Sequence, residues 1–432
     1  MPHVVDEPAP SDPSTRGRHH PELTQLPTTA TDVVVASTSL LFAVLVGVDG
    51  PAPWPVVRAV VVLVAGAGCL VARRRLGIRG KMVPTLSFGL AGMIAGLGIG
   101  VSHLVEKPWS AEAIAGSLTL VGGVVLASVS SWGLIRAAHR WWKLSAVPIG
   151  LAILVLVFAP VTLAVFVTNA PPFDPVTVTP ADRGLRSSDV SMLTADHVRL
   201  EGRYIPSTNG AAIIVLGGIS GIGEHEVDIA AVLARHGYGV LLLNARGQGD
   251  SDGDAMLWGW WGEIDVAAGL DYLAARADVV DGRIAAIGMS VGGEQAIAAA
   301  GVDRRLRAVV SEGATARGAR DEGDPARGVG GLVVRYVDWV SRNAAALMTA
   351  ADPPTPLRDS LAAFDGQRAL LIAAGRSESE IAATDVFRAS APDRVDVWIA
   401  PDASHTDASR RYPDEWERRV VGFLDDTLAP LG

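Results

Sequence analysis

Cysteine is nearly absent from this chain, since Cys69 is the only one in 432 residues. A single thiol cannot form an intrachain disulfide, so any folded region must be held together by an apolar core. Lysine is also scarce, with none after Lys143, and the formal net charge is −9. Because nucleic-acid backbones are bound by clustered Lys and Arg, this balance argues against a nucleic-acid partner.

Long apolar runs, by contrast, fill the first part of the chain. Each is close to the ~20 residues that a helix needs to cross the hydrocarbon core of a bilayer. Five runs in succession before one polar region favour membrane spans over buried core helices. We therefore predict a polar tail over residues 1–32 and a transmembrane helical region over residues 33–168. The five expected spans lie at roughly residues 33–48, 56–72, 83–105, 113–135 and 146–168.

Basic residues lie in alternate loops of this region. RRRLGIRGK separates the second and third spans, and Arg136, Arg140 and Lys143 separate the fourth and fifth. The other two loops, VDGPAP and EKPWSAE, have almost no basic excess. Short loops rich in Lys and Arg stay in the cytoplasm, so we expect a multi-pass protein of the cell membrane with its C-terminal region outside. The tail lacks the layout of a cleaved signal peptide, so the first span is expected to remain as an anchor.

A Pro-rich linker, residues 169–185, leads into a different pattern. Over residues 186–432, strand-like apolar runs such as AAIIVLGG and GVLLLNARG alternate with helical runs such as HEVDIAAVLARHG. This alternation predicts an α/β fold, with a mostly parallel sheet covered by helices on both faces. Residues 319–364 interrupt the rhythm and are expected to form either a cap over a pocket or a solvated surface excursion.

Gly-x-Ser-x-Gly occurs twice in this region, around Ser251 and Ser290. Ser290 directly follows the strand-like RIAAIG and is followed by small residues and the helical run EQAIAAA. That layout is typical of a nucleophile elbow, which strains the serine backbone and presents its hydroxyl at a helix N-terminus. Ser251 lies among aspartates with no immediate helix, so GDSDG is interpreted as a turn. Ser290 is therefore the candidate nucleophile.

A histidine near neutral pH can accept the proton of a serine hydroxyl, and His405 is the best candidate base. It follows a predicted strand and precedes the final predicted helix, whereas His197, His225 and His236 lie early in the domain.

The motifs LGGISG, NARGQGDSDG, GMSVGG, GRSESE and PDASHTDA follow one another in that order. On these motifs, residues 190–428 resemble the α/β-hydrolase superfamily, and most closely its branch of dienelactone-hydrolase-like and serine-aminopeptidase-like enzymes. The resemblance implies a serine, an acid and a histidine in that chain order. The family usually has Asp at the position of Glu378, so Glu378 is the first choice for the acid. Glu380 is the second choice and Glu312 the third.

The resemblance also implies an oxyanion hole formed by the backbone N–H groups of Val291 and Ile219. Many relatives have His-Gly where this chain has Gly217 and Gly218. Backbone donors do not depend on the side chain, so this difference is compatible with activity.

These residues predict a serine hydrolase, membrane-anchored and esterase-like, with no metal and no organic cofactor. The same triad could also cleave a peptide or a thioester, or transfer the acyl group to another alcohol, and these activities remain alternatives. A further alternative is a catalytically inactive module used for binding or assembly. A small-molecule or lipid-like acyl compound is the expected substrate, and membrane lipids are expected partners. The tryptophans of MLWGWWGE are expected either in an apolar pocket, at the lipid surface or in the core.

A second interpretation concerns Gly217, Gly221 and Gly223, which match the Gly-x-x-x-Gly-x-Gly opening of short-chain dehydrogenases. In that pattern a helix N-terminus binds a dinucleotide pyrophosphate. Those enzymes also need Tyr-x-x-x-Lys, and no lysine follows Lys143 in this chain. An NAD(P)-binding domain is therefore the weaker alternative.

Overall fold

The computed structural model describes residues 28–47, 53–171, 177–318, 320–321, 328–349 and 351–429. The predicted polar tail lies outside these residues except for positions 28–32. Parts of the predicted linker, residues 172–176, and of the predicted insertion, residues 319, 322–327 and 350, also lie outside them.

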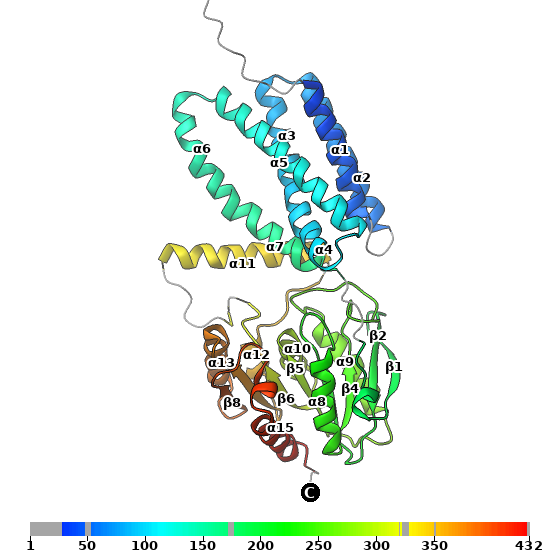
Figure 1. Ribbon diagram of the computed structural model, residues 1–432. Helices are drawn as coiled ribbons and strands as arrows, with labels where there is room; N and C mark the ends of the chain where they lie inside the picture. Colours follow the sequence, from blue (N-terminus) through cyan, green and yellow to red (C-terminus); the bar gives the residue numbers. More distant parts are fainter. Residues whose placement is uncertain are drawn as a thin grey trace, which may run out of the picture.

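The first part of the described chain is a helical bundle (Figure 1). Five of its helices are long and apolar enough to cross a membrane, in agreement with the five predicted spans. The third and fifth continue through a short π-helical segment, labelled η. These five long helices are α1 (Thr28–Gly47), α2 (Trp54–Arg75), then α3 (Ile78–Ala95) with η1 (Gly96–Gly100) and α4 (Val101–Glu106), then α5 (Ala111–Ala137), and finally α6 (Arg140–Ile153) with η2 (Leu154–Phe158) and α7 (Ala159–Thr168).

The second part is a sheet of eight strands in the order β1-β2-β4-β3-β5-β6-β7-β8. β1 pairs antiparallel with β2, and β2 antiparallel with β4, while all other neighbours are parallel. This is the α/β-hydrolase fold, as predicted. The strands are β1 (Ser188–Leu193), β2 (Arg199–Ile205), β3 (Ala212–Leu216), β4 (Gly239–Leu243), β5 (Ile284–Met289), β6 (Leu306–Glu312), β7 (Arg368–Ala374) and β8 (Val395–Ala400).

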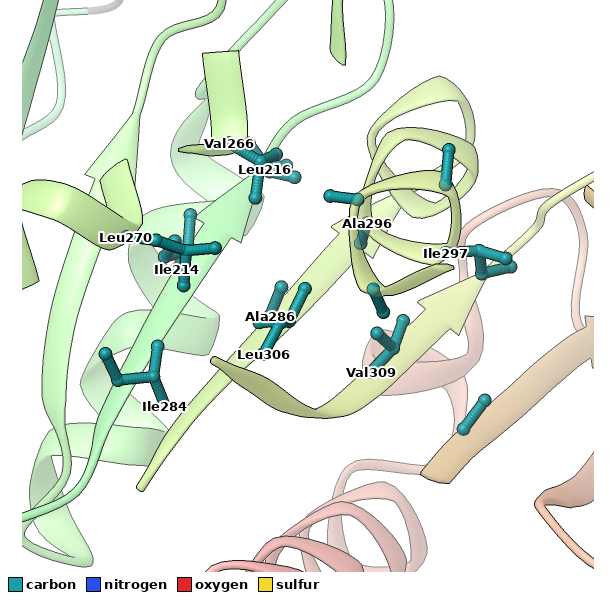
Figure 2. Close-up of a cluster of buried hydrophobic side chains, with 14 of the residues drawn as sticks. Ile214, Leu216, Val266, Leu270, Ile284, Ala286, Ala296, Ile297, Leu306 and Val309 are labelled. Carbon is teal, nitrogen blue, oxygen red and sulfur yellow. The ribbon is translucent and has the colours of Figure 1, made fainter. Parts of the chain in front are cut away.

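Helices cover both faces of this sheet. Successive strand residues point to opposite faces, so Ile214 and Leu216 of β3 join one apolar cluster while Ile213 and Val215 join another. The first cluster includes side chains of α9 (Gly262–Ala274), α10 (Val291–Val302), α12 (Leu357–Ala362) and α13 (Glu378–Ser390), and Figure 2 shows its centre. The second includes side chains of α8 (Glu224–Arg235), α14 (Ala408–Arg411) and α15 (Pro413–Thr427). A short 3-10 helix, η3 (Pro180–Arg183), precedes β1.

The predicted insertion contains α11 (Gly328–Thr349), which lies across the end of the bundle, between it and the α/β domain (Figure 1). Ala345 of α11 and Ala164 of α7 belong to one buried cluster with Met256 and Trp260 of the loop before α9. The Leu257 N–H donates a hydrogen bond of 3.1 Å to the Val167 carbonyl of α7. The insertion is therefore packed between the two parts of the protein.

Candidate active site

Ser290 lies at the turn between β5 and α10, with φ 53° and ψ −121°. A non-glycine residue with positive φ is strained and persists only when its surroundings fix it. Here the Ser290 N–H donates a hydrogen bond of 2.8 Å to the Glu312 carbonyl of the neighbouring strand β6. The sharp turn places the hydroxyl at the N-terminus of α10, as in a nucleophile elbow.

The two glycines of the motif allow this turn to pack tightly. A Cβ atom on Gly292 would lie 2.3 Å from the Gly217 carbonyl oxygen, and one on Gly288 would lie 2.2 Å from the Gly292 carbonyl carbon. No side chain fits at either position without moving backbone. The glycines of Gly-x-Ser-x-Gly are thus required by the contact between the turn, α10 and the loop after β3.

His405 connects the serine to a carboxylate. Its Nε2 lies 2.9 Å from Ser290 Oγ, and its Nδ1 lies 2.8 Å from Glu380 Oε1. Because an ionised carboxylate can only accept, Nδ1–H donates to Glu380 and Nε2 is left to accept from the serine hydroxyl. The hydrogen bond to Glu380 raises the pKa of His405, with burial acting in the opposite direction. The three side chains have the geometry of a serine-hydrolase triad.

The acid in contact with His405 is Glu380, and the choice of Glu378 is corrected by this geometry. Glu378 is the first residue of α13 and is exposed, whereas Glu380 is buried. Ser377 caps the helix and accepts from the Glu380 N–H at 3.4 Å. The Glu380 side chain also accepts the Ala374 N–H, at 2.8 Å, so its carboxylate is held from two sides.

Glu312, the third choice for the acid, binds the chain segment that follows His405. It accepts hydrogen bonds from the Ala408 N–H at 2.8 Å and from Trp416 Nε1 at 2.9 Å. Both donors follow His405 in the chain, so Glu312 fixes the segment that leads away from the catalytic loop. Burial raises the pKa of Glu312 to about 7, against the lowering effect of its two donors.

Val291 and Ile219, predicted as the two oxyanion donors, line the same cavity. Val291 is the first residue of α10, and the N–H groups of a helix's first turn have no intrahelical acceptor. Ile219 lies in the turn after β3, which is held by hydrogen bonds from the Gly221 N–H and Gln248 Nε2 to the Gly218 carbonyl, at 3.1 and 3.0 Å. The site can therefore present backbone donors to a negatively charged oxygen.

The rest of the cavity wall comes from the loop after β4, the tryptophan segment and the start of α10. Arg246 pairs with the buried Asp265 at 2.7 Å and with Asp196 at 2.8 Å, which fixes the loop. Sequence reasoning did not single out Gln248 or Gln295. Gln295 lies four residues after Val291, and this spacing places both on the same side of α10, so the sequence could have predicted that Gln295 faces the cavity. The cavity is lined by Ile219, Ala245, Arg246, Gln248, Ala255, Met256, Leu257, Gly259, Trp260, Trp261, Asp265, Val291 and Gln295.

Ser251, the second serine in a Gly-x-Ser-x-Gly pattern, has a different environment. Its hydroxyl donates to the Asn244 carbonyl at 2.9 Å and accepts the Glu201 N–H, also at 2.9 Å. It therefore ties the loop after β4 to β2, as the interpretation of GDSDG as a turn requires.

In the glycine loop that resembles a dinucleotide site, a side chain of this protein binds the helix N-terminus. Glu226 of α8 accepts the Gly223 N–H at 2.7 Å, so a carboxylate occupies the helix N-terminus where a pyrophosphate would bind. Among the residues that the structure describes, no group of three or more His, Cys, Asp or Glu side chains is placed to hold a metal ion.

Comparison with known proteins places this site in a family. Residues 162–415, more than half of the chain, match the family model for X-Pro dipeptidyl-peptidase (S15 family). An uncharacterized protein of Mycobacterium tuberculosis is 34% identical over 112 residues, which cover 25% of this chain and 39% of that protein. A thiohydrolase of Aspergillus aculeatus is 30% identical over 133 residues, covering 29% of this chain and 40% of the enzyme. The chain thus spans about two fifths of the length of these curated relatives.

Solved structures show a similar fold at low identity. An esterase of Pyrococcus furiosus is 24% identical, with a TM-score of 0.47, and the match covers 60% of this chain and 99% of the esterase. An α/β hydrolase from a Penicillium species is 19% identical, with a TM-score of 0.44, covering 57% of this chain and 100% of that protein. With its strand order, its strained serine and the matched family model, the chain belongs to the X-Pro dipeptidyl-peptidase (S15) family and has the α/β-hydrolase fold.

Proposed function

We propose that this protein is a membrane-anchored serine hydrolase that cleaves a carboxylic ester through an acyl-serine intermediate. The observation that carries the proposal is the continuous hydrogen-bonded chain from Ser290 through His405 to Glu380, with the serine held at a strained elbow. This arrangement supplies a nucleophile, a base and a group that orients the base.

Each residue has a defined step. His405 Nε2 takes the hydroxyl proton as Ser290 Oγ attacks the ester carbonyl carbon, and Glu380 stabilises the imidazolium that forms. The Val291 and Ile219 N–H groups bind the carbonyl oxygen as it becomes negative. His405 then gives its proton to the departing alcohol as the ester C–O bond breaks. In the second half, His405 takes a proton from water as the water oxygen attacks the acyl-serine carbonyl. His405 then gives that proton to Ser290 Oγ as the bond between Oγ and the acyl carbon breaks, which releases the acid and free Ser290.

A peptide bond is the second candidate, and the description of the matched family favours it. A dipeptidyl-peptidase that removes residues from a chain end must bind a free ammonium group, for which an unpaired carboxylate is the natural partner. Among the described residues that line the cavity, Asp265 is the sole carboxylate, and it is paired with Arg246. This pairing supports an ester over a peptide N-terminus. The thiohydrolase relative adds a thioester as a related substrate on the same triad.

Anchoring in the cell membrane is the other part of the proposal. It is supported by the length and apolar composition of the five helices. The basic loops further support an orientation in which the hydrolase domain lies outside the cytoplasm.

The test uses the full chain purified in detergent and a fluorophosphonate probe that labels activated serines. We expect labelling of the unaltered protein and of Ser251→Ala, the matched control in the second Gly-x-Ser-x-Gly, and none of Ser290→Ala. A panel of acyl esters of graded chain length, a thioester and an Xaa-Pro peptide then identifies the bond that is cleaved. Labelling that persists in Ser290→Ala, or folded protein that turns over none of the esters, would refute the esterase proposal.

A further inference from the structure

One face of α11 is an exposed apolar stripe, formed by Val329, Leu332, Tyr336, Trp339 and Leu347. Residues three, four, seven or eight positions apart lie on the same side of a helix, so these side chains form a continuous row, interrupted at Asn343. Trp339 is 62% exposed and Leu347 is 88% exposed. A helix in contact with water normally presents polar side chains on such a face.

The contacts that α11 makes with the rest of the described protein come from its opposite face, on which Val334 is also half exposed. Gly331, Ser341 and Ala345 are buried, and Ala345 packs in the cluster with Ala164, Met256 and Trp260. Arg342 pairs with Asp338 at 2.8 Å and its guanidinium lies 5.2 Å from the ring centre of Trp258. The apolar stripe is therefore not the side by which α11 contacts the rest of the described protein.

The place of α11 in the fold indicates what covers the stripe. The helix lies across the end of the bundle (Figure 1), and Thr168, the last residue of α7, contacts the Met348 sulfur at 3.9 Å. Near this junction α7 itself exposes Leu163 and Phe166. If the bundle spans a bilayer, α11 lies at the level where the spans leave the hydrocarbon, and its stripe continues the apolar surface of α7.

The same helix lies near the cavity beside Ser290 that Val291 and Ile219 line. Met256 and Trp260 line that cavity together with Val291, the residue after Ser290, and they belong to the same buried cluster as Ala345 of α11. The wall of the cavity and the stripe are thus separated by the thickness of one helix.

We propose that α11 lies in the plane of the membrane surface with its apolar stripe inserted among lipid chains, and that the enzyme takes its substrate, an acyl ester of a membrane-resident lipid, directly from the bilayer. The assignment of substrate class rests on the proposed function. Tyr336 and Trp339 in the stripe are the residue types that favour the membrane–water interface. Lipid is a better occupant of this face than a second copy of the chain. The neighbouring apolar helices are surrounded by lipid in a bilayer, and a second copy would have to displace that lipid to reach the stripe.

The lipid contact is tested with spin labels in the full chain reconstituted into phosphatidylcholine and phosphatidylglycerol vesicles. In a Cys69→Ala background, single cysteines replace Leu332, Trp339 and, as a control, Val302, which is exposed at the far end of α10. We expect labels at 332 and 339 to be more accessible to oxygen than to a water-soluble nickel chelate, and the label at 302 to show the reverse. Water-like accessibility at both stripe positions, or dipolar broadening from a second copy there, would overturn the lipid contact.

The substrate class is tested with a double variant, Leu332→Ser with Trp339→Ser, and with Val302→Ser as its control. Against a long-chain fluorogenic ester in vesicles, we expect the double variant to lose at least about tenfold in rate, because two large apolar side chains no longer enter the lipid. Hydrolysis of a water-soluble acetyl ester should stay at the unaltered rate. Equal losses on both substrates, or no loss on the vesicle ester, would overturn uptake from the bilayer. If the unaltered protein hydrolyses no ester at all, the proposed function and the substrate class fail together, while the spin labels still decide the lipid contact.

Discussion

Glu380 is held in one orientation by the backbone around it. Its carboxylate accepts from the Ala374 N–H and from His405 Nδ1, and its side chain is only 2% exposed. Such a group fixes the tautomer of the histidine and stabilises the charge that forms on it during catalysis. Glu378, two positions earlier, is exposed at the start of α13.

The pair of glutamates gives a matched test. We expect Glu380→Gln to lower kcat by about two to four orders of magnitude, because an amide in place of the carboxylate favours the wrong tautomer of His405. Glu378→Gln should retain the unaltered kcat. Both variants can be assayed on the best ester found in the substrate panel, and the thermal unfolding midpoint of each shows that it is folded. A large loss in Glu378→Gln together with a small one in Glu380→Gln would show that the acid is misassigned.

The same variants should differ in their pH profiles. His405 must be neutral to act as a base, so kcat/KM rises as pH increases through the pKa of His405. The Glu380 hydrogen bond raises that pKa, and Glu380→Gln removes this cause, so the acid limb of its profile should move to lower pH. By linkage, the interaction stabilises the folded chain below the unfolded pKa of histidine, ~6.5, and this stabilisation is lost as pH rises through the folded pKa. An acid limb at the same pH in all three proteins would contradict the role of Glu380.

Ser290 and His405 could be chosen from the sequence because each follows an apolar strand and precedes a helical run. Their order in the chain, with the serine before the histidine, also agrees with the order that the family resemblance implies. The acid could not be settled in the same way, because GRSESE contains two glutamates and the sequence does not show at which residue the following helix begins. The helix in fact begins at Glu378 after its cap, Ser377, and this places the third helical residue, Glu380, toward His405. A shift of helix start by one turn changes which side chain points inward.

At the scale of elements, the turn between β5 and α10 depends on a close approach of backbone to backbone. We expect Gly292→Ala to destabilise the domain by about 1–3 kcal/mol and to abolish most activity, because the added Cβ would overlap the Gly217 carbonyl and displace the elbow. The shift in thermal unfolding midpoint of the full chain in detergent measures the first effect.

Gly422 offers the control for this substitution. It lies on the exposed side of α15, where an added Cβ would meet nothing within 4 Å. Gly422→Ala should raise the stability of the domain by roughly 0.5–1 kcal/mol through helix propensity alone. A Gly292→Ala protein as stable and as active as Gly422→Ala would mean that the elbow tolerates a side chain.

Element prediction succeeded where side chains alternate or run apolar, and β2 to β8 all have such patterns. β1 was not expected, because half of Ser188–Leu193 is polar and only Met192 is buried. It is an edge strand that pairs with β2 alone, so hydrogen bonding to a neighbour defines it more than burial does. The insertion, expected either as a cap or as a surface excursion, contains one long helix, α11, over Gly328–Thr349.

Across the whole molecule, basic residues gather at one end of the bundle. Arg73, in the last turn of α2, pairs with Asp32, in α1, at 2.6 Å, and Arg74 and Arg75 follow it. Because Lys and Arg flanking spans remain in the cytoplasm, we expect the hydrolase domain on the other side of the membrane. A C-terminal tag should be removed by protease added to intact spheroplasts. A tag that is cleaved only after the membrane is permeabilised would reverse the orientation.

The hydrogen bond from Leu257 to the Val167 carbonyl, with the packing of α11 on α7, clamps the catalytic domain to the last turn of the fifth span. A catalytic domain joined to the helical bundle by a flexible linker would occupy many positions, at distances from the bundle that increase with linker length. In this protein the packing instead holds the Ser290 hydroxyl at a nearly constant distance from the end of the helical bundle. If the substrate is a lipid of the membrane, as we propose, encounter becomes a search in two dimensions. Its rate then depends on the density of the substrate in the membrane and not on a concentration in the surrounding solution.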